Sequence, residues 1–384
     1  MSINFNKIPT PCFLLDEQSL EVNLQILNMV QQEAKVRIIC ALKGFSFWYG
    51  FPMVRQYLSG AAASSLNEAR LIAEEMSSLS HSYCPVYKDE EFETMLVYSS
   101  HLTFNSLTQY QKYYQRAKNF GKDVSLGLRI NPQYSEVKTA LYNPAQEGSR
   151  LGVLRSQLGD TLPEGIEGLH FHVLCENDSY TLERTLREVE KYFSDLIKQA
   201  KWINMGGGHL ITQEDYDVEH LVNLLKDFRK RYPNLEEIIL EPGSAVGWQT
   251  GFLVASVQDI LPSKDFSIAM LDISFACHTP DCLEMPYKPT ILHAHNPLPN
   301  DKYIYRMGGN SCLAGDYIGM GDYAFDQPLE IGEKIIFEDM IHYTMVKTTF
   351  FNGVLHPHIA VWTKADELLI LRSFDYENYK IKLS

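Results

Sequence analysis

The sequence predicts a parallel (β/α)8 TIM-type barrel plus a mostly antiparallel C-terminal β domain. Short apolar segments alternate with amphipathic ones from residue 36 onwards, and eight such pairs can be counted before Gly243. Alternation of this kind implies parallel βα units, and eight of them favour a barrel, although an open doubly wound sheet could be drawn from the same elements. Past Gly243 the segments become short, β-branched or aromatic, and Pro, Gly, Asn and Asp separate them, which is typical of an all-β region.

The first element is a strand at "CFLLD", which precedes the barrel and can join the β domain. Asp16 can then cap a helix whose Leu20, Leu24 and Leu27 share one face. We expect the barrel to occupy residues 17–245 and the β domain to combine residues 1–16 with residues 246–384. The eight barrel strands are predicted at "VRIICAL" (36–42), "GAAASS" (60–65), "HSYCP" (81–85), "HLTFNS" (101–106), "DVSLGLRI" (123–130), "IEGLHFHV" (166–173), "KWINM" (201–205) and "EEIILE" (236–241).

The β domain is predicted from seven further segments. They are "GFLVASVQDI" (251–260), "FSIAMLDISF" (266–275), "TILHAH" (290–295), "KYIYRMG" (302–308), "EKIIFEDM" (333–340), "YTMVKTTFF" (343–351) and "HIAVWT" (358–363).

The composition excludes several classes of protein. With 384 residues, of which 45% are hydrophobic, the chain can form more than one core. A net charge of −14 argues against a nucleic-acid binder and is compatible with a cationic substrate. No apolar run reaches the roughly 18 residues of a membrane span, and the N-terminus has no signal-peptide pattern.

Seven scattered cysteines without a CxxC pair indicate reduced thiols and a cytoplasmic protein. The spacing of Cys277, His278 and Cys282 does not suit zinc, so we expect no metal.

Chemically capable residues finish five of the eight predicted barrel strands. They are Lys43, Arg129, His172, the "MGGGH" segment (205–209) and Glu241. Each has an ordinary explanation taken alone, because a strand-end lysine usually reaches solvent and a glycine run often forms only a turn. Catalytic residues of barrels lie at these strand ends, so their coincidence at one mouth favours a shared site.

One cofactor would explain this set of residues. A glycine-rich loop exposes N–H groups that can bind a phosphate, and a lysine can form a Schiff base with an aldehyde. A carboxylate that faces a pyridine nitrogen keeps it protonated, and an imidazole can stack on the ring. Together these groups predict a site for pyridoxal 5'-phosphate (PLP).

The chain resembles the fold type III PLP decarboxylases, the alanine-racemase-like group that includes ornithine and diaminopimelate decarboxylases. The resemblance covers nearly the whole chain and is carried by "CALKGF", "HFHV", "NMGGGH", "LEPGS", "GGNSCLAGD" and "HYTMVKTTFFNG". Within this group, "CALKGFS", "GAAASSLNEA" and "LDISFACHTPDCLEMPYKP" look most like the carboxynorspermidine (carboxyspermidine) decarboxylases of polyamine biosynthesis.

The resemblance implies a role for each strand-end residue. Lys43 would hold PLP covalently, His172 would stack on its ring, and Glu241 would pair with its pyridine nitrogen. Arg129 matches an arginine that lies behind the ring. The phosphate would be surrounded by Gly207, Gly208, Gly243 and Tyr343.

The resemblance also implies a head-to-tail homodimer with two shared sites. Cys312 matches a cysteine that the neighbouring subunit supplies, and it would protonate the substrate Cα after CO2 leaves. Asp316 lies on the same loop and would contact the substrate. A racemase instead needs acid–base groups on both faces of Cα, so this cysteine favours decarboxylation.

Three positions depart from the pattern of the ornithine decarboxylases. Ser244 follows "EPG" where those enzymes commonly have an arginine that helps to bind phosphate. The run 61–63 is alanine where they have an acid, and Cys175 stands where a serine is expected.

The implied substrate is a small cationic carboxylated polyamine. Segment 271–289 occupies the specificity region of the group, where Asp272, Asp281 and Glu284 could bind amines and His278 could contact a carboxylate. The alternatives are a diaminopimelate, ornithine or arginine decarboxylase of the same fold, an unrelated sugar-phosphate barrel enzyme, or a non-enzymatic PLP-binding homeostasis or regulatory protein.

Overall fold

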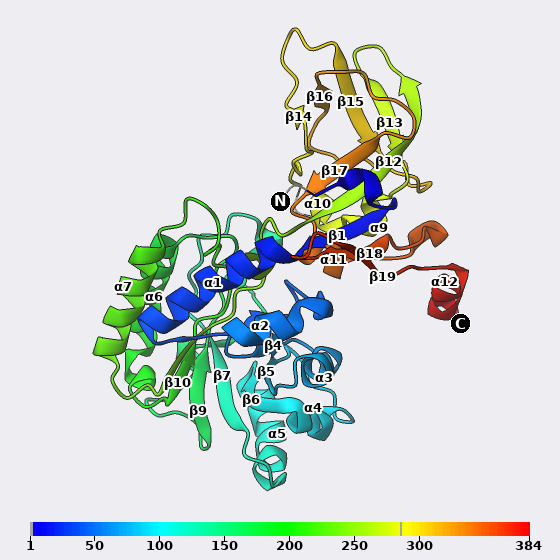
Figure 1. Cartoon of the computed structure of the whole chain (residues 1–384). Coiled ribbons are helices and arrows are strands. Elements are labelled where there is room, and N and C mark those ends of the chain that lie inside the picture. Colours follow the sequence, from blue (N-terminus) through cyan, green and yellow to red (C-terminus); the bar gives the residue numbers. More distant parts are fainter. Residues whose placement is uncertain (1–2, 285) are drawn as a thin grey trace. The chain divides into compact units, whose positions relative to one another are not determined.

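The structure, a computed structural model, describes residues 3–284 and 286–384. It divides into two compact units (Figure 1). Asn23–Val246 form the first, which we call the barrel unit. The described residues up to Val22 and from Gly247 onward form the second, the β unit. The division falls within helix α1 (Glu17–Ala34).

Asp16 fixes the first turn of α1. Its carboxylate accepts hydrogen bonds from the Gln18 N–H at 3.0 Å and from the Ser19 hydroxyl at 2.6 Å.

The barrel unit contains the eight predicted strands in parallel order. In order around the sheet they are β2 (Arg37–Ile38), β11 (Glu237–Leu240), β10 (Trp202–Asn204), β9 (Ile166–His170), β7 (Ser125–Asn131), β6 (Ser99–Phe104), β5 (Ser80–Tyr83), β4 (Ala61–Ala63) and β3 (Cys40–Ala41). The short strand β8 (Val153–Leu154) pairs with β7 outside this path.

The first barrel strand is divided at Ile39. Its β2 half pairs with β11 and its β3 half pairs with β4, both in parallel. One strand therefore joins the last strand of the barrel to the second, which closes the ring. The predicted barrel, rather than the open sheet, is confirmed.

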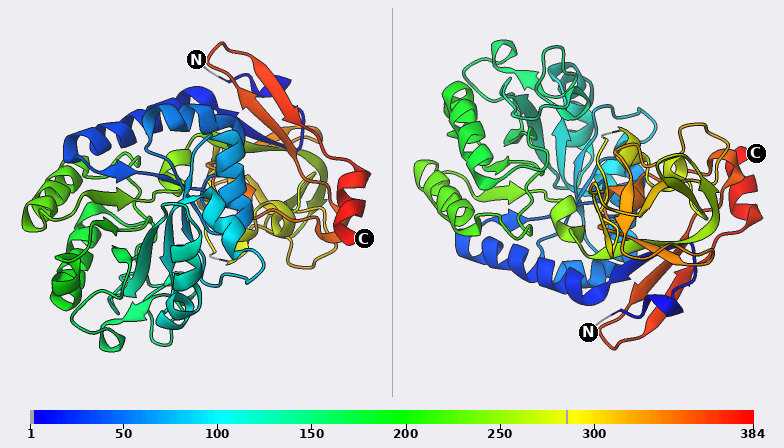
Figure 2. Two further views of the ribbon diagram at one scale, coloured as in Figure 1. Left: turned by 90° about the horizontal axis from the view of Figure 1, so that it is seen from below. Right: turned by 90° about the horizontal axis from the view of Figure 1, so that it is seen from above.

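Helices lie on the outside of the barrel strands (Figures 1 and 2). They are α2 (Phe51–Tyr57), α3 (Leu66–Glu75), α4 (Phe92–Tyr98), α5 (Leu107–Asn119), α6 (Ser179–Ile197) and α7 (Val218–Arg231). Helix α6 shows why a helix covers the strands with one face. Its buried apolar residues recur at helical spacing: Leu182, Leu186, Val189 and Phe193. Asp178 caps its first turn by accepting from the Thr181 N–H.

One bulky side chain fills part of the barrel interior. Trp202 of β10 packs with Ile39, Ala62 and Ile239 from other strands. A side chain at Gly168, on the neighbouring strand β9, would overlap the indole ring. The small residue on β9 therefore leaves room for the large one on β10, and the interior of the closed barrel is filled by side chains.

The β unit is a nine-stranded mixed sheet that includes the N-terminal strand. Its path is β14 (Ala294–His295), β16 (Tyr323–Phe325), β15 (Tyr303–Gly308), β13 (Ser267–Leu271), β12 (Gly251–Pro262), β1 (Cys12–Asp16), β18 (His358–Trp362) and β19 (Leu368–Arg372), and β17 (Lys334–Glu338) also pairs with β12. Two pairings, β1 with β18 and β13 with β15, are parallel, and the other six are antiparallel. Figure 2 shows the N-terminal strand beside the C-terminal ones.

The predicted strand "YTMVKTTFF" is wrong. Tyr343–Val346 form the short helix α11, because the Met345 and Val346 N–H groups bond back to the His342 carbonyl. The Thr344 hydroxyl is buried and donates to Asp281 at 2.8 Å, so a residue that reads as a strand former is instead fixed by a tertiary contact.

Several β-unit elements were absent from the prediction or shorter than expected. The strands β16 and β19 and the helices α9 (Phe275–His278), α10 (Pro280–Glu284) and α12 (Tyr376–Leu383) were not predicted, and "TILHAH" keeps only a two-residue strand. Each helix among the described residues is too short or too polar to cross a membrane.

Candidate active site

A cavity of about 540 Å³ lies at the carboxyl ends of the barrel strands, entirely within the barrel unit. Its wall includes most of residues 140–151, in the segment that follows β7, together with Lys43, Tyr83, Arg129, His170, His172 and Glu241. Its volume is in the range of small-molecule sites. Four predicted residues, Lys43, Arg129, His172 and Glu241, therefore share one cavity.

Lys43 is held by the turn that follows β3. The Gly44 and Phe45 N–H groups both bond to the Ala41 carbonyl, at 3.0 and 3.1 Å, so the strand ends in a tight turn at the lysine. Burial, followed by the positive charge of Arg129, lowers the pKa of Lys43, while Glu241 acts in the opposite direction. The site therefore favours the neutral, nucleophilic amine.

The hydrogen bonds of His172 define its tautomer. Nδ1 accepts from the Gly207 N–H at 3.0 Å, so the proton of the neutral ring is on Nε2, which lies 3.3 Å from Lys43 Nζ. Burial holds the pKa of His172 well below its ordinary value, and the charge of Arg129 acts in the same direction, so the ring is neutral. A neutral Nε2–H can donate to Lys43 only when the amine is unprotonated, and the lowered pKa shifts the lysine towards that form.

Glu241 follows β11, and its carboxylate is bonded from the adjacent strand β10. Asn204 Nδ2 donates to Glu241 Oε1 at 2.6 Å, and His170 Nε2 lies 3.9 Å from Oε2. Burial raises the pKa of Glu241, and the Asn204 bond and the charges of Lys43 and Arg129 oppose that shift.

Arg129 crosses the wall of the cavity from β7. Its guanidinium carbon lies 4.7 Å from the centre of the Tyr83 ring, and Nη2 donates to the His172 carbonyl at 3.0 Å. Arg129 is only 4% exposed, so its orientation is set by this packing.

The glycine run after β10 permits close backbone approach. Gly206 and Gly208 have φ values of 71° and 86°, which favour glycine, and a Cβ on Gly207 would overlap the Glu241 carbonyl. A Cβ on Gly44 would lie 2.7 Å from the Gly243 Cα. The lysine turn and the "EPGS" turn therefore pack backbone against backbone.

These residues fit PLP. The cavity joins an amine-bearing lysine, a carboxylate and a flat imidazole. Two glycine turns lie next to these residues in the chain: Gly44 follows Lys43, and Gly243 lies two residues after Glu241. The cavity is also lined by His81 and His170, whose buried ring nitrogens have no hydrogen-bond partner among the described residues. A polar ring with substituents would satisfy groups of this kind.

The remaining predicted residues belong to the β unit. Cys312 is exposed, and its N–H donates to Asn352 at 2.8 Å. Asp316 is buried and accepts from the Ala276 and Ser311 N–H groups, both at 3.0 Å, so it fixes the loop that carries Cys312.

Two other predicted substrate contacts make hydrogen bonds within the β unit. Asp272 accepts from the N–H and hydroxyl of Ser256, at 2.8 and 2.6 Å. His278 is fully buried, and its Nδ1 accepts from the Ser274 N–H at 3.2 Å. Tyr343 begins α11.

Sequence reasoning missed several residues around the cavity. Tyr83, His81 and His170 lie inside predicted strands, where only their inward direction distinguishes them. Glu68 was read as part of a helix, yet its carboxylate accepts from the Ser64 N–H at 2.6 Å, and burial raises its pKa while Lys43 opposes the shift. Because successive side chains of a strand point to opposite faces, the positions of Tyr83, His81 and His170 in their strands could have indicated that they point into the barrel.

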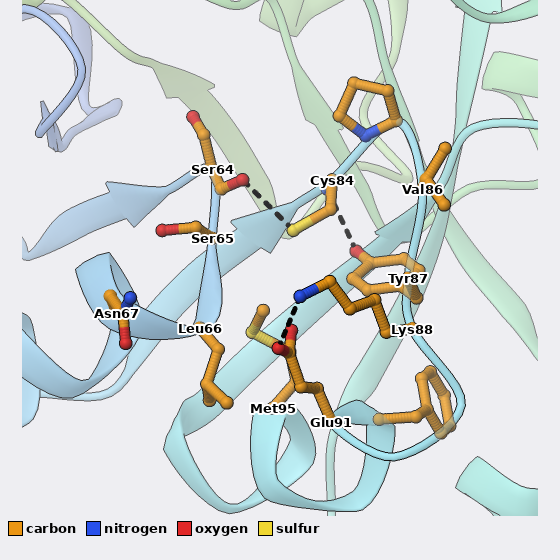
Figure 3. A pocket seen from close by; sticks show the side chains of 12 residues that line it. Ser64, Ser65, Leu66, Asn67, Cys84, Val86, Tyr87, Lys88, Glu91 and Met95 are labelled. Carbon is orange, nitrogen blue, oxygen red and sulfur yellow. Dashed lines mark hydrogen bonds and ion pairs between the residues drawn. The ribbon is translucent and has the colours of Figure 1, made fainter. Parts of the chain in front are cut away.

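A second cavity of about 380 Å³ lies beside the first, where β4 and β5 end (Figure 3). Both cavities are lined by Ser64 and Pro85. The Cys84 thiol donates to the Ser64 carbonyl at 3.2 Å, and Lys88 pairs with Glu91 at 2.9 Å. Its polar groups largely bond to one another.

A closed parallel barrel with a lysine, an imidazole, an arginine and a carboxylate around one strand-end cavity defines the class of PLP-binding barrels. The family model described as "Pyridoxal-dependent decarboxylase, C-terminal sheet domain" matches residues 18–341. The chain belongs to this family of pyridoxal-dependent decarboxylases.

Individual relatives agree with this assignment. A carboxyaminopropylagmatine decarboxylase of Synechocystis is 49% identical over 98% of this chain and 96% of its own length. A carboxynorspermidine/carboxyspermidine decarboxylase of Campylobacter jejuni is 41% identical over 98% of this chain and 99% of its own length. The crystal structure of carboxynorspermidine decarboxylase from that genus and species, complexed with norspermidine, superposes with a TM-score of 0.90 at 40% identity and covers 98% of this chain and 100% of its own.

Two expectations from the sequence are thereby confirmed. The likeness to carboxynorspermidine and carboxyspermidine decarboxylases holds, and the chain is an enzyme, a PLP-dependent decarboxylase. The non-enzymatic alternative and the unrelated sugar-phosphate enzyme are wrong.

Proposed function

We propose that this decarboxylase removes CO2 from a carboxylated polyamine, carboxynorspermidine or carboxyspermidine, and releases norspermidine or spermidine. The observation that carries the chemistry is the cavity in which the Lys43 amine faces a neutral His172 while Glu241 lies on the same wall. The Campylobacter jejuni relative of 41% identity supports the substrate, as does a carboxynorspermidine/carboxyspermidine decarboxylase of Herminiimonas arsenicoxydans that is 32% identical over 98% of this chain.

In this proposal the chain's residues hold the cofactor and control its proton. Lys43 would hold PLP through its amine, His172 would lie against the ring, and Glu241 would keep the pyridine nitrogen protonated. When bound, PLP supplies an electron sink for the bond between Cα and the carboxylate. Arg129 would support the cofactor from β7, and Gly207, Gly208, Gly243 and Tyr343 would bind its phosphate.

Cys312 donates the proton that replaces CO2 at Cα, and it is contributed by a second copy of the chain in a homodimer. Its exposure in the single chain, on a loop fixed by the buried Asp316, supports this role. His172 is the other residue proposed to contact the cofactor during the reaction.

Asp281 is proposed to bind the cationic tail of the substrate. Asp272 is bonded to Ser256, and Glu284 pairs with Lys347. Asp281 is only 8% exposed; its Oδ2 accepts from the Thr344 and Tyr287 hydroxyls, and its Oδ1 has no partner among the described residues. A buried carboxylate without a cation is stabilised by a positively charged ligand.

The second candidate substrate is carboxyaminopropylagmatine. The 49% identity to the Synechocystis enzyme favours it. This substrate carries a guanidinium in place of a terminal ammonium, and a planar guanidinium bonds a carboxylate through two N–H groups.

Two measurements test the proposal. Purified protein should absorb in the visible range, lose that absorbance on borohydride treatment, and lose it in Lys43→Ala. CO2 release should be compared for carboxynorspermidine, carboxyspermidine, carboxyaminopropylagmatine, diaminopimelate, ornithine and arginine. The highest kcat/KM on one of the first two supports the proposal, the third would move it to the second candidate, and preference for any of the last three would overturn it.

A further inference from the structure

The Glu241 carboxylate is bonded by a buried asparagine whose orientation is unambiguous. Asn204 is the last residue of β10 and is 3% exposed. Its Oδ1 accepts from the Gly206 N–H at 2.9 Å, and a backbone N–H can only donate. Its Nδ2 therefore faces Glu241 and donates to Oε1 at 2.6 Å.

Asn204 joins the two elements that the cofactor would contact. One side of its amide supports the glycine turn, and the other side supports the carboxylate. The Glu241 N–H in turn bonds to the Gly206 carbonyl at 2.7 Å. A donor at this position favours the ionised carboxylate, because an N–H hydrogen bond is stronger to a charged oxygen than to a neutral one.

We infer that Asn204 is a positioning residue that holds Glu241 ionised and aimed at the pyridine nitrogen of the cofactor. This inference rests on the proposed PLP site. The other charged or titratable groups that face Glu241 are Lys43, Arg129 from β7 and His170 from β9, and none of them bonds to its Oε1.

The substitution Asn204→Asp separates this role from simple support of the turn. An aspartate keeps the oxygen that accepts from Gly206 but replaces the donor toward Glu241 with a second carboxylate. Two carboxyl groups this close share one proton, so the pair ionises fully only at raised pH. While the shared proton is present, the acid O–H can donate to Glu241 in place of the amide; once it is lost, the two charges repel.

We expect Asn204→Asp to add a pH response, relative to the unsubstituted protein, to the affinity of the apoprotein for PLP measured by absorbance titration. At low pH, Asn204→Asp should bind PLP nearly as well as the unsubstituted protein. At high pH it should bind PLP about 10- to 100-fold more weakly than the unsubstituted protein, because loss of a hydrogen bond to a charged group changes affinity by about this factor. Asn204→Ala should bind weakly throughout the pH range, and Glu241→Ala should abolish the pH response of Asn204→Asp.

Asn131→Asp is a matched control. Asn131 ends β7 and is 4% exposed. Its Oδ1 accepts from the N–H two residues onward, that of Gln133, at 2.8 Å. Its Nδ2 donates to the Leu151 carbonyl rather than to a carboxylate. It should show no pH-dependent loss of PLP.

The outcomes distinguish this inference from the proposed function. If the unsubstituted protein itself fails to bind PLP, the proposed function is overturned. If it binds PLP while Asn204→Asp follows the same affinity profile, or Asn131→Asp shows the same pH response, the role of Asn204 is overturned. Thermal unfolding of the apoproteins across the same pH range provides the folding control.

Discussion

Lys43 Nζ lies 3.3 Å from His172 Nε2, and the second nitrogen of that ring accepts from the Gly207 N–H. The relationship couples three strand ends. The N–H of the glycine turn sets the tautomer of His172, and this tautomer presents a donor that can bond to Lys43 when the amine is unprotonated. The backbone of one strand end thereby favours the reactive form of a side chain on another.

The first prediction concerns the charge state of Lys43. Burial and the charge of Arg129 lower its pKa, and the charge of Glu241 opposes this shift. Acylation of the apoprotein by acetic anhydride, followed by peptide mass spectrometry across pH, should therefore begin at lower pH for Lys43 than for exposed lysines in the same digest. Arg129→Gln removes a like charge and should move the Lys43 profile to higher pH, whereas Glu241→Gln should move it to lower pH. Identical profiles for both variants would contradict this account.

The second prediction concerns the contact between two glycine turns. In Gly44→Ala the new Cβ would lie 2.7 Å from the Gly243 Cα, so the turns must separate. We expect the free energy of unfolding to fall by about 1–3 kcal/mol, together with weaker PLP binding. Gly159→Ala is the control, because no atom lies within 4 Å of its Cβ, and its effect should remain within about 0.5 kcal/mol. Equal denaturation midpoints for the two variants would refute the contact.

The third prediction concerns the loop of Cys312. Asp316→Asn leaves one oxygen for two backbone donors, the Ala276 and Ser311 N–H groups, and should destabilise the protein by about 1–3 kcal/mol. Hydrogen exchange should accelerate across residues 309–316. The exposed Asp326, changed to Asn, should leave both measurements unchanged. Unaltered exchange in Asp316→Asn would mean that other contacts fix this loop.

The fourth prediction concerns the proposed shared sites. Lys43→Ala and Cys312→Ala should each abolish or strongly reduce decarboxylation when purified separately. If the two residues come from different subunits, random reassociation gives half mixed dimers with one intact site of two, so about a quarter of the wild-type activity should return. Absence of recovery, with subunit exchange verified by mass, would assign both residues to the same subunit.

The barrel could be predicted because its signals are local. Each strand is a short apolar run, each helix has an apolar face, and the eightfold alternation leaves few topologies. The four cavity residues Lys43, Arg129, His172 and Glu241 could be predicted for a related reason: parallel strands bring their ends to one mouth, so position along the chain implies proximity in space.

The β unit was harder to predict because its elements depend on tertiary contacts. Thr344 occurs in a sequence of strand formers, yet its hydroxyl is bonded to Asp281, far away along the chain. The role of Asn204 could not be recognised from the sequence either, because "WINM" reads as an ordinary buried strand and the carboxylate partner of the asparagine comes from another strand.

The division of the first barrel strand at Ile39 has a consequence for how the protein matures. Since β2 must pair with β11, the ring of strands stays incomplete until nearly the whole barrel has been synthesised. Lys43 follows one half of the divided strand, and Glu241 follows the strand that pairs with the other half. The cofactor site is therefore a late product of folding, and capture of PLP by a nascent or refolding chain would report the moment at which the barrel closes.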